Sequence, residues 1–286
     1  AAQESPAATS QGTMPFSDEP DTYERPERRL FPLMSDKMAE NIAKRGAVLP
    51  PPFGVMYITN WMDSDWEFTS ASVSLGNSPY IDLDAADDAT MDLQVQSNGG
   101  KADLWLFPFL DLMVGFGKVD VDAQLGLRDI PISYDPGIGG GTTVRGDAII
   151  PMKFDGTYYS FGGVLAGAYK RFYGAMDFSW VKTKLNGDAS LSASGFWTFT
   201  AAPKFGYNAG LSQIYVGARY ISKNEHYTGT IDLASGHPLA FDVGISTDSW
   251  VGNFGLRTII RNRWEVLMES AIGSRYQITG GFGYRW

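Results

Sequence analysis

The sequence predicts an all-β fold: a transmembrane antiparallel up-and-down β-barrel of ten strands, with twelve as the alternative count and a short N-terminal helix before the first strand. Three observations support this prediction. Apolar and polar residues alternate over long stretches, as in strands with one face toward lipid and one toward a polar interior. Many stretches reach the roughly 9–11 residues that a tilted strand needs to cross a bilayer. Long and short connections also alternate along the chain, except that the final "GSR" is short on the side of the long ones.

Composition excludes several classes of protein. The formal net charge of −9 leaves no basic stripe for a phosphate backbone, so a nucleic-acid partner is not expected. The chain has no cysteine, which excludes disulfides and thiolate metal sites. The most apolar run, "LWLFPFLDLMVGFG", is broken by Pro108 and Asp111 and is too short for a membrane helix. The start, "AAQESPAATSQG", lacks the features of a signal peptide, and we expect a mature, exported chain.

The chain divides into three parts. Residues 1–29 are rich in Ser, Pro, Gln, Glu and Asp, and we expect a disordered tail. Residues 30–52 contain a short amphipathic helix, capped by Ser35 and ended by Gly46, and then a Pro-rich approach to the first strand. This helix is expected at a barrel mouth, or alternatively as a plug inside the lumen. Residues 53–286 form the predicted barrel.

The predicted strands begin at Phe53. We place them at 53–76, 90–108, 110–127, 157–170, 172–184, 194–207, 212–227, 240–260, 263–273 and 275–286. The alternative of twelve strands arises at 53–98 and 128–156, where one long stretch has room for two strands. Both termini are expected on the same side of the membrane, so the number is even.

The connections fall into two kinds. Short ones occur at "PFLD", "YKRF", "YNAGLSQ" and "IRNR". Between them are longer ones: "NSPYIDLDAADDA", the 128–156 segment, "TKLNGDASLSAS" and the region around "YTGTIDLASGHPLAF". Bacterial outer-membrane barrels have short periplasmic turns and longer extracellular loops. A soluble sandwich has no reason to sort its connections in this way.

The two faces of the strands also differ in chemistry. In one strand Tyr159, Phe161 and Leu165 share the face expected to contact lipid. Eight charged residues fall on the opposite faces: Asp177, Lys204, Arg219, Arg257, Glu265, Glu269, Arg275 and Arg285. They are the candidates for a lumen or constriction site. Two interpretations remain open: a salt-bridged filler of a small barrel, or the lining of a narrow path that selects solutes by charge.

No pattern predicts catalysis or a cofactor. The two histidines, His226 and His237, have no Ser or Asp partner at a spacing that would define a hydrolase. Four weak metal candidates, Asp82, Asp84, Asp87 and Asp88, lie in "DLDAADD" but lack the spacing and glycine of an EF-hand. A solvated acidic loop is the simpler interpretation. "PGIGGGTT" has no following Lys and is expected to be a flexible or inward-folded loop rather than a phosphate site.

The C-terminal "TGGFGYRW" resembles the barrel-assembly signal of Gram-negative outer-membrane β-barrel proteins at Thr279, Gly281, Tyr284 and Trp286. The resemblance implies that the assembly machinery recognises these residues and that the last strand closes against the first. It also implies an integral outer-membrane protein with periplasmic N- and C-termini, in contact with lipid and lipopolysaccharide.

The leading functional hypothesis is a narrow, partly occluded channel for uptake of small molecules, hydrophobic ones among them. The alternative is a structural barrel whose loops bind a surface partner or lipopolysaccharide. A barrel-embedded hydrolase ranks third. The sequence does not specify the substrate, the oligomeric state or whether the lumen is open.

Overall fold

The computed structural model describes residues 33 and 35 and the ranges 51–66, 68–75, 80–83, 89–134, 142–187, 191–193, 195–232, 238–261 and 263–286. The expected tail over 1–29 and the expected helix after Ser35 lie outside these residues, as does most of the 30–52 segment. Within the described ranges all regular structure is β, and no helix there has the length and apolar character to cross a bilayer.

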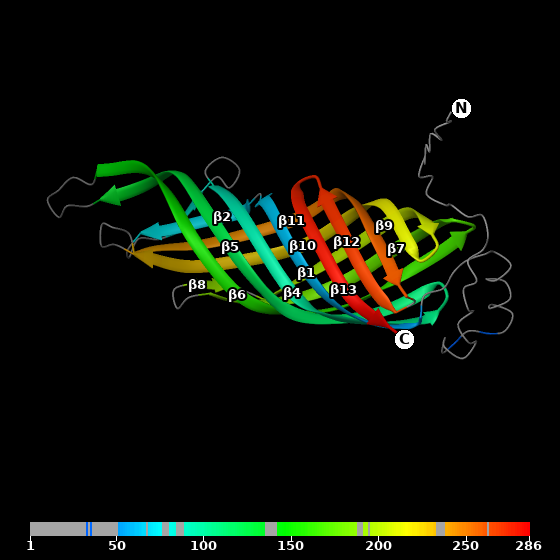
Figure 1. The fold of residues 1–286 in the computed structure, drawn as a ribbon. Coiled ribbons are helices and arrows are strands. Elements are labelled where there is room, and N and C mark those ends of the chain that lie inside the picture. The colour runs from blue at the N-terminus through cyan, green and yellow to red at the C-terminus, as the bar shows by residue number, and fades with distance from the viewer. Residues whose placement is uncertain are drawn as a thin grey trace, which may run out of the picture.

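The strands form one antiparallel sheet that closes on itself (Figure 1). They are β1 (Phe53–Trp66), β2 (Phe68–Leu75), β3 (Ile81–Leu83), β4 (Ala89–Phe107), β5 (Leu110–Tyr134), β6 (Thr142–Tyr169), β7 (Phe172–Gly187), β8 (Leu191–Ala193), β9 (Phe196–Ala209), β10 (Ser212–Asp232), β11 (Pro238–Ile260), β12 (Trp264–Ile272) and β13 (Arg275–Arg285). β1 and β2 follow one another around residue 67, and β3 and β8 are three-residue pieces. The wall therefore has ten strands, which confirms the predicted fold and count.

Closure depends on the two ends of the barrel segment. β1 pairs with β4 on one side and with β13 on the other, from Gly54↔Arg285 to Ser64↔Arg275. The last residue takes part, because Trp286 N donates to Phe53 O at 3.0 Å and Phe53 N donates to Trp286 O at 3.3 Å. In lipid an open sheet edge would leave backbone groups unpaired, so this pairing is what lets the sheet span a bilayer.

The long connections predicted from the sequence are largely wrong. The 128–156 segment was expected to be a loop, but β5 continues to Tyr134 and β6 begins at Thr142, in register down to Tyr134↔Thr142. β7, β10 and β11 likewise extend into stretches expected to be loops. The short connections are confirmed as tight turns, at Pro108–Phe109, Lys170–Arg171 and Gly210–Leu211. We call the end with these turns the turn end, and the opposite, longer part of the barrel the extension.

The prediction is wrong because the apolar face of the strands changes from outward to inward along the barrel. In the first part of β5, Leu112, Val114 and Phe116 point outward and are 42%, 60% and 67% exposed. Beyond residue 117 the outward positions become polar, while Leu125 and Leu127 point inward and are 0% and 1% exposed. The alternation continues with the apolar side exchanged, as expected where a strand passes from lipid into water.

A hydrophobic cluster fills the interior of the extension. Its members are Phe68, Ala71, Val73, Met91, Leu93, Val119, Val121, Ala123, Leu125, Leu127, Ile150, Met152, Phe154, Leu185, Tyr227, Leu239, Phe241, Val243 and Ile245. Outside, the same strands carry polar groups such as the exposed Lys153–Asp122 ion pair at 2.9 Å. The extension is therefore built like a water-soluble β-structure, with its apolar side chains buried together.

The strands that form the wall also differ between the extension and the rest of the barrel. The β12–β13 hairpin ends at Gly273 and Ser274, next to the pair Gly252↔Ile272 of β11 and β12. Farther into the extension, β2 takes the place beside β11, from Ile245↔Phe68 to Leu239↔Leu75. The circumference there lacks β12 and β13, and we infer that this narrowing helps the apolar side chains to meet.

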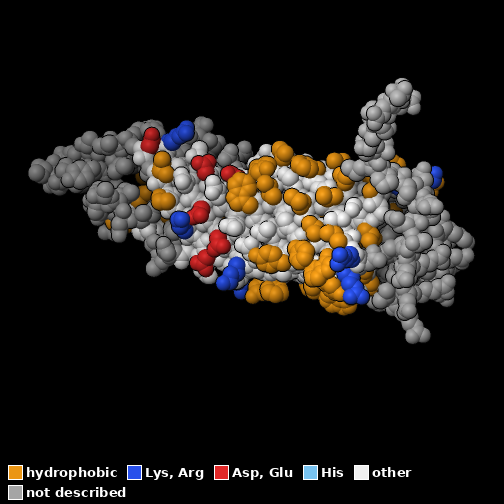
Figure 2. Space-filling model, in the orientation of Figure 1, with side chains coloured by type: hydrophobic (Ala, Val, Ile, Leu, Met, Phe, Trp, Pro, Cys, Tyr) orange, Lys and Arg blue, Asp and Glu red, His pale blue; other side chains and the backbone are white. Residues whose placement is uncertain are grey.

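The outer surface of the barrel between the turn end and the extension carries an apolar band (Figure 2). A chain of ring contacts links Trp197, Phe161, Trp180, Phe199, Tyr220 and Trp250 at the border with the extension. A second group at the turn end joins Phe53, Trp286, Tyr284 and Trp264. On β9, Trp197 and Tyr207 mark the two borders; ten residues of strand tilted by about 40° rise roughly 25 Å, the height of a barrel's lipid-facing band. The band defines the membrane-spanning part.

The reversal can be tested with two adjacent isoleucines of β6. Ile150 points inward and is 3% exposed, whereas Ile149 points outward and is 76% exposed. We expect Ile150→Ala to lower the free energy of unfolding by about 2–5 kcal/mol, because it leaves a cavity in the cluster. Ile149→Ala should change it by less than about 0.5 kcal/mol. Urea unfolding in detergent measures both, and equal effects would contradict the assignment of inner and outer faces.

The border of the apolar band can be tested on β5. We expect Val114→Arg to oppose membrane insertion by about 2–4 kcal/mol, because it places a charge on the lipid-facing wall. Asp120→Arg, on the same outward face but in the extension, should cost less than about 1 kcal/mol. The two variants are compared by their folding into lipid vesicles, measured from the gel mobility of the folded barrel. A similar loss of folding in both variants would mean that the apolar band does not end between residues 114 and 120.

Candidate binding cavity in the barrel interior

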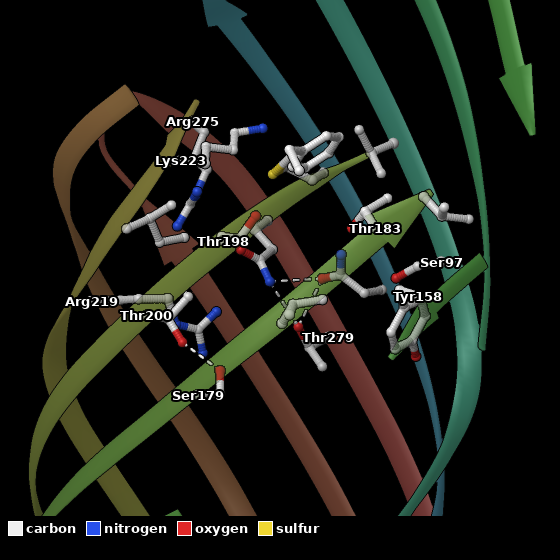
Figure 3. A pocket seen from close by; sticks show the side chains of 18 of the residues that line it. Ser97, Tyr158, Ser179, Thr183, Thr198, Thr200, Arg219, Lys223, Arg275 and Thr279 are labelled. Carbon is white, nitrogen blue, oxygen red and sulfur yellow. Dashed lines mark hydrogen bonds between the residues drawn. The ribbon is translucent and has the colours of Figure 1, made fainter. Parts of the chain in front are cut away.

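A cavity of about 410 Å³ lies inside the barrel where the membrane-spanning part meets the extension. Figure 3 shows its polar side, to which Ser179 on β7, Thr200 on β9 and Thr279 on β13 contribute hydroxyl groups. Its opposite side is apolar, with Leu93 and Val121 among the residues that line it. The cavity is amphipathic because the inner face of the wall changes from polar to apolar at this height.

An ionic network lies at the turn-end side of the cavity. Lys204 Nζ lies 2.6 Å from Asp177 Oδ2 and 2.7 Å from Glu269 Oε2. Glu269 also pairs with Arg219 and accepts a hydrogen bond from Tyr215 Oη at 2.7 Å. Two cations and two carboxylates therefore neutralise one another. We call these residues the cavity floor.

A second ionic network fills the barrel near the turn end. Arg285 is 0% exposed and forms ion pairs with Asp103 and with Glu265 Oε2, the latter at 2.7 Å. Arg257 Nε contacts the other oxygen of Glu265 at 2.5 Å. Arg285 Nε also donates to Pro51 O at 3.0 Å, which ties the approach to the first strand to the last strand. This network joins β4, β11, β12 and β13 across the interior.

A separate ion pair borders the cavity on the side of the extension. Lys223 Nζ lies 2.7 Å from Glu225 Oε1, and Tyr227 Oη donates to Glu225 Oε2 at 3.0 Å. All three side chains are buried and come from alternate positions of β10. Glu225 is therefore satisfied by a cation and a phenol.

Arg275 differs from the other inward charges. It is 7% exposed and lines the cavity. Among the described residues, no acceptor lies within hydrogen-bond distance of its Nε or Nη2. Burial of a guanidinium is costly unless its N–H groups find acceptors, and a partner in the cavity would supply them.

The eight charged residues predicted from the sequence all lie on the inner face. The structure brings Asp177, Lys204, Arg219 and Glu269 together in the floor, and Arg257, Glu265 and Arg285 together near the turn end, and leaves Arg275 apart. Their role in selecting solutes stays a prediction.

Sequence reasoning missed several inner polar groups. Lys223 and Glu225 follow Arg219 at even spacing on β10, so the alternation alone places them on its face. Asp103 shares a face with Lys101 and Trp105 in "KADLW", but nothing in the sequence joins it to Arg285, since that contact crosses the barrel closure.

Two of the four residues of the C-terminal pattern point inward and two outward. Thr279 Oγ1 donates to Asn60 Oδ1 at 3.0 Å, and a Cβ at Gly281 would lie 2.7 Å from Met56 Sδ. Trp286 is 51% exposed in the apolar band, where Tyr284 contacts it. Each therefore has a structural role in closure, and recognition by assembly machinery stays a prediction.

The histidines and the acidic loop supply no reactive centre among the described residues. His226 Nε2 lies 3.1 Å from Asp242 Oδ1 on the exposed surface, while His237 lies outside the described residues. Asp82 accepts a hydrogen bond from Ser72 Oγ at 2.8 Å, and Asp84, Asp87 and Asp88 lie outside the described residues. The described part of the chain holds no group of three or more potential metal ligands.

No protein-family model and no curated protein sequence matches this chain. Among solved structures, it is similar to the transport unit of the autotransporter AIDA-I from Escherichia coli, with 11% identity, a TM-score of 0.43 and coverage of 82% of this chain and 89% of that one. It is also similar to the outer membrane protein OprG from Pseudomonas aeruginosa, with 8% identity, a TM-score of 0.42 and coverage of 82% and 97%. A Pseudomonas aeruginosa FadL homologue has 8% identity, a TM-score of 0.29 and coverage of 82% and 89%. These likenesses are too distant to say what this chain does.

Arg285 offers a test of the network near the turn end. We expect Arg285→Met to lower the free energy of unfolding by about 3–5 kcal/mol, because Asp103 loses its main buried partner and Glu265 loses one of two. Adding Asp103→Asn should recover much of this loss, since Glu265 keeps Arg257. The matched control is Arg263→Met, an exposed residue that donates to Tyr284 Oη, with a cost of at most about 1 kcal/mol. Urea unfolding in detergent measures all three, and no rescue by the second substitution would contradict the ion-pair assignment.

Proposed function

We propose that this chain is an integral outer-membrane barrel that takes up small amphipathic or hydrophobic molecules through a narrow, normally occluded interior. The observation that carries the proposal is the amphipathic cavity of about 410 Å³. Its size falls within the roughly 300–1,000 Å³ typical of small-molecule sites, and its few polar groups face an apolar wall, as such sites usually do.

The interior on both sides of the cavity supports an occluded path. On one side lies the hydrophobic cluster, where Phe241 is 1% exposed. On the other side lie the floor and the network around Arg285. A solute that crosses the barrel therefore has to displace side chains, first apolar ones and then ion pairs, which restricts passage to small molecules.

We propose an orientation from the two ends of the barrel. Both ends of the barrel segment, Phe53 and Trp286, lie at the turn end, and the extension carries charged groups on its outer surface. Outer-membrane barrels keep short turns on the periplasmic side and longer segments outside. We therefore assign the termini to the periplasm and the extension to the cell exterior.

A second function is favoured by the same apolar cluster. A filled extension is a rigid support, and its outer surface and loops would then bind a surface partner or lipopolysaccharide. In that case the cavity is a packing defect and no solute crosses. Flux of small molecules therefore separates the two functions.

Phe241 and Phe254 of β11 provide a matched pair for this test. Phe241 points into the cluster, whereas Phe254 faces outward and is 53% exposed. In liposomes that contain the full chain, we expect slow uptake of small aromatic solutes, increased several-fold by Phe241→Ala because the ring blocks the path. Phe254→Ala should leave the rate unchanged. The absence of uptake through both the unmodified chain and Phe241→Ala would overturn the channel and favour the structural barrel.

A further inference from the structure

The cavity contains one cation whose charge is not matched by the residues around it. Two carboxylates line the cavity, and each already has a cationic partner: Asp177 pairs with Lys204 and Glu225 pairs with Lys223. Arg219, which also lines the cavity, pairs with Glu269 of the floor. Arg275, in contrast, has no counterion among the described residues, and its Nε and Nη2 have no hydrogen-bond partner there.

Arg275 is also held where a ligand can reach it. It is the first residue of β13, opposite Ser64 of β1, and it follows the turn that ends the β12–β13 hairpin. It lines the cavity, as Arg219 and Lys223 do (Figure 3). Fixed strand positions and burial make the guanidinium a preorganised donor of hydrogen bonds.

The neighbouring groups add polar contacts beside this charge. Gln277 Nε2 donates to Asn60 Oδ1 at 2.8 Å, and Thr279 donates to the same oxygen. Ser179 and Thr200 share a hydrogen bond of 2.6 Å on the facing wall, so one of these two hydroxyls keeps its hydrogen free to donate to a ligand. The polar side of the cavity therefore suits a small oxyanion.

The opposite side of the cavity excludes a bare, hydrated ion as the best occupant. It is formed by apolar side chains that continue into the cluster, such as Leu93, Val121 and Leu185. Burying an apolar body there is favourable at roughly 25 cal/mol per Å² of surface removed from water. An anionic head and an apolar body in one molecule use both sides.

We propose that the cavity binds organic monoanions, specifically carboxylates on an apolar body, and that Arg275 pairs with the carboxylate. This inference deepens the proposed function, because it names the ligand class for the same cavity. The carboxylate of the ligand supplies a counterion for Arg275, while the apolar body lies against the Leu93 side. Neutral molecules of the same shape lack the first of these interactions.

Two probes of nearly equal shape test the proposal. With the full chain in lipid nanodiscs at pH 7, titration calorimetry corrected with empty nanodiscs measures binding of 4-butylbenzoate and of its neutral analogue 4-butylbenzamide. We expect the acid to bind at least about tenfold more tightly, the increment of one charge-assisted hydrogen bond. The proposal would be overturned if the acid and the amide bound with equal affinity. It would also be overturned if acetate, which lacks the apolar body, bound as tightly as 4-butylbenzoate.

Variants then test whether Arg275 is the residue that binds the carboxylate. Arg275→Gln should reduce the affinity for the acid about tenfold or more and leave that for the amide unchanged, and Arg275→Lys should retain a preference for the acid. Val121→Trp, which fills the apolar side, should weaken both probes. Arg263→Gln at the turn end is the matched control and should change neither. Undiminished binding of the acid to a folded Arg275→Gln protein would overturn the assignment.

The experiments test anion binding in the cavity and solute uptake through the barrel separately. Acid binding that depends on Arg275, without solute uptake in liposomes, would support the site and reject transport. Uptake without any preference for the acid would support transport and reject the site.

Discussion

Closure of the sheet is the constraint on which the remaining structure depends. In a bilayer each backbone N–H and C=O needs a partner within the protein, and an open edge has none. β1 supplies both partners, since it pairs with β4 and with β13. The closure extends to Phe53 and Trp286, whose backbone groups bond reciprocally and whose rings contact one another at 4.6 Å between centroids. The same closure brings Arg285 to Asp103 and so creates the ionic filling near the turn end.

The outer surface of the barrel faces lipid in one part and water in the other, and this difference explains which side chains fill the interior of each part. Where lipid surrounds the barrel, apolar rings face outward and the interior contains paired charges. Where water surrounds it, charges face outward and the interior is a hydrophobic cluster. The hydrophobic effect acts only on the water-exposed part, because lipid chains are as apolar as the side chains themselves. The charges of the membrane-spanning part, in contrast, are tolerated because nearly all are paired.

This reversal also explains what the sequence could and could not predict. Strand alternation and tight turns such as Lys170–Arg171 predicted the ten strands, because both signals are local. The segment 128–156 was wrongly predicted as a loop. Its apolar residues Ile150, Met152 and Phe154 point inward, opposite to the outward apolar face of the membrane-spanning strands. The inner charges were identified from alternation alone. Their grouping was not, since contacts such as Arg285 with Asp103 join residues 182 positions apart.

The cavity occupies the level where these two interiors meet, and this position accounts for its chemistry. A cluster of apolar side chains cannot satisfy a guanidinium, and the carboxylates of the floor pair with Lys204 and Arg219 and form no hydrogen bond with Arg275 Nε or Nη2. Arg275 stands between them at the end of the β12–β13 hairpin, where the wall changes its strands. A purely structural residue at that level would be better replaced by an uncharged one, because a buried and unmatched charge lowers stability. Among the described residues, Arg275 Nε and Nη2 have no hydrogen-bond acceptor, and an anionic molecule in the cavity would supply one.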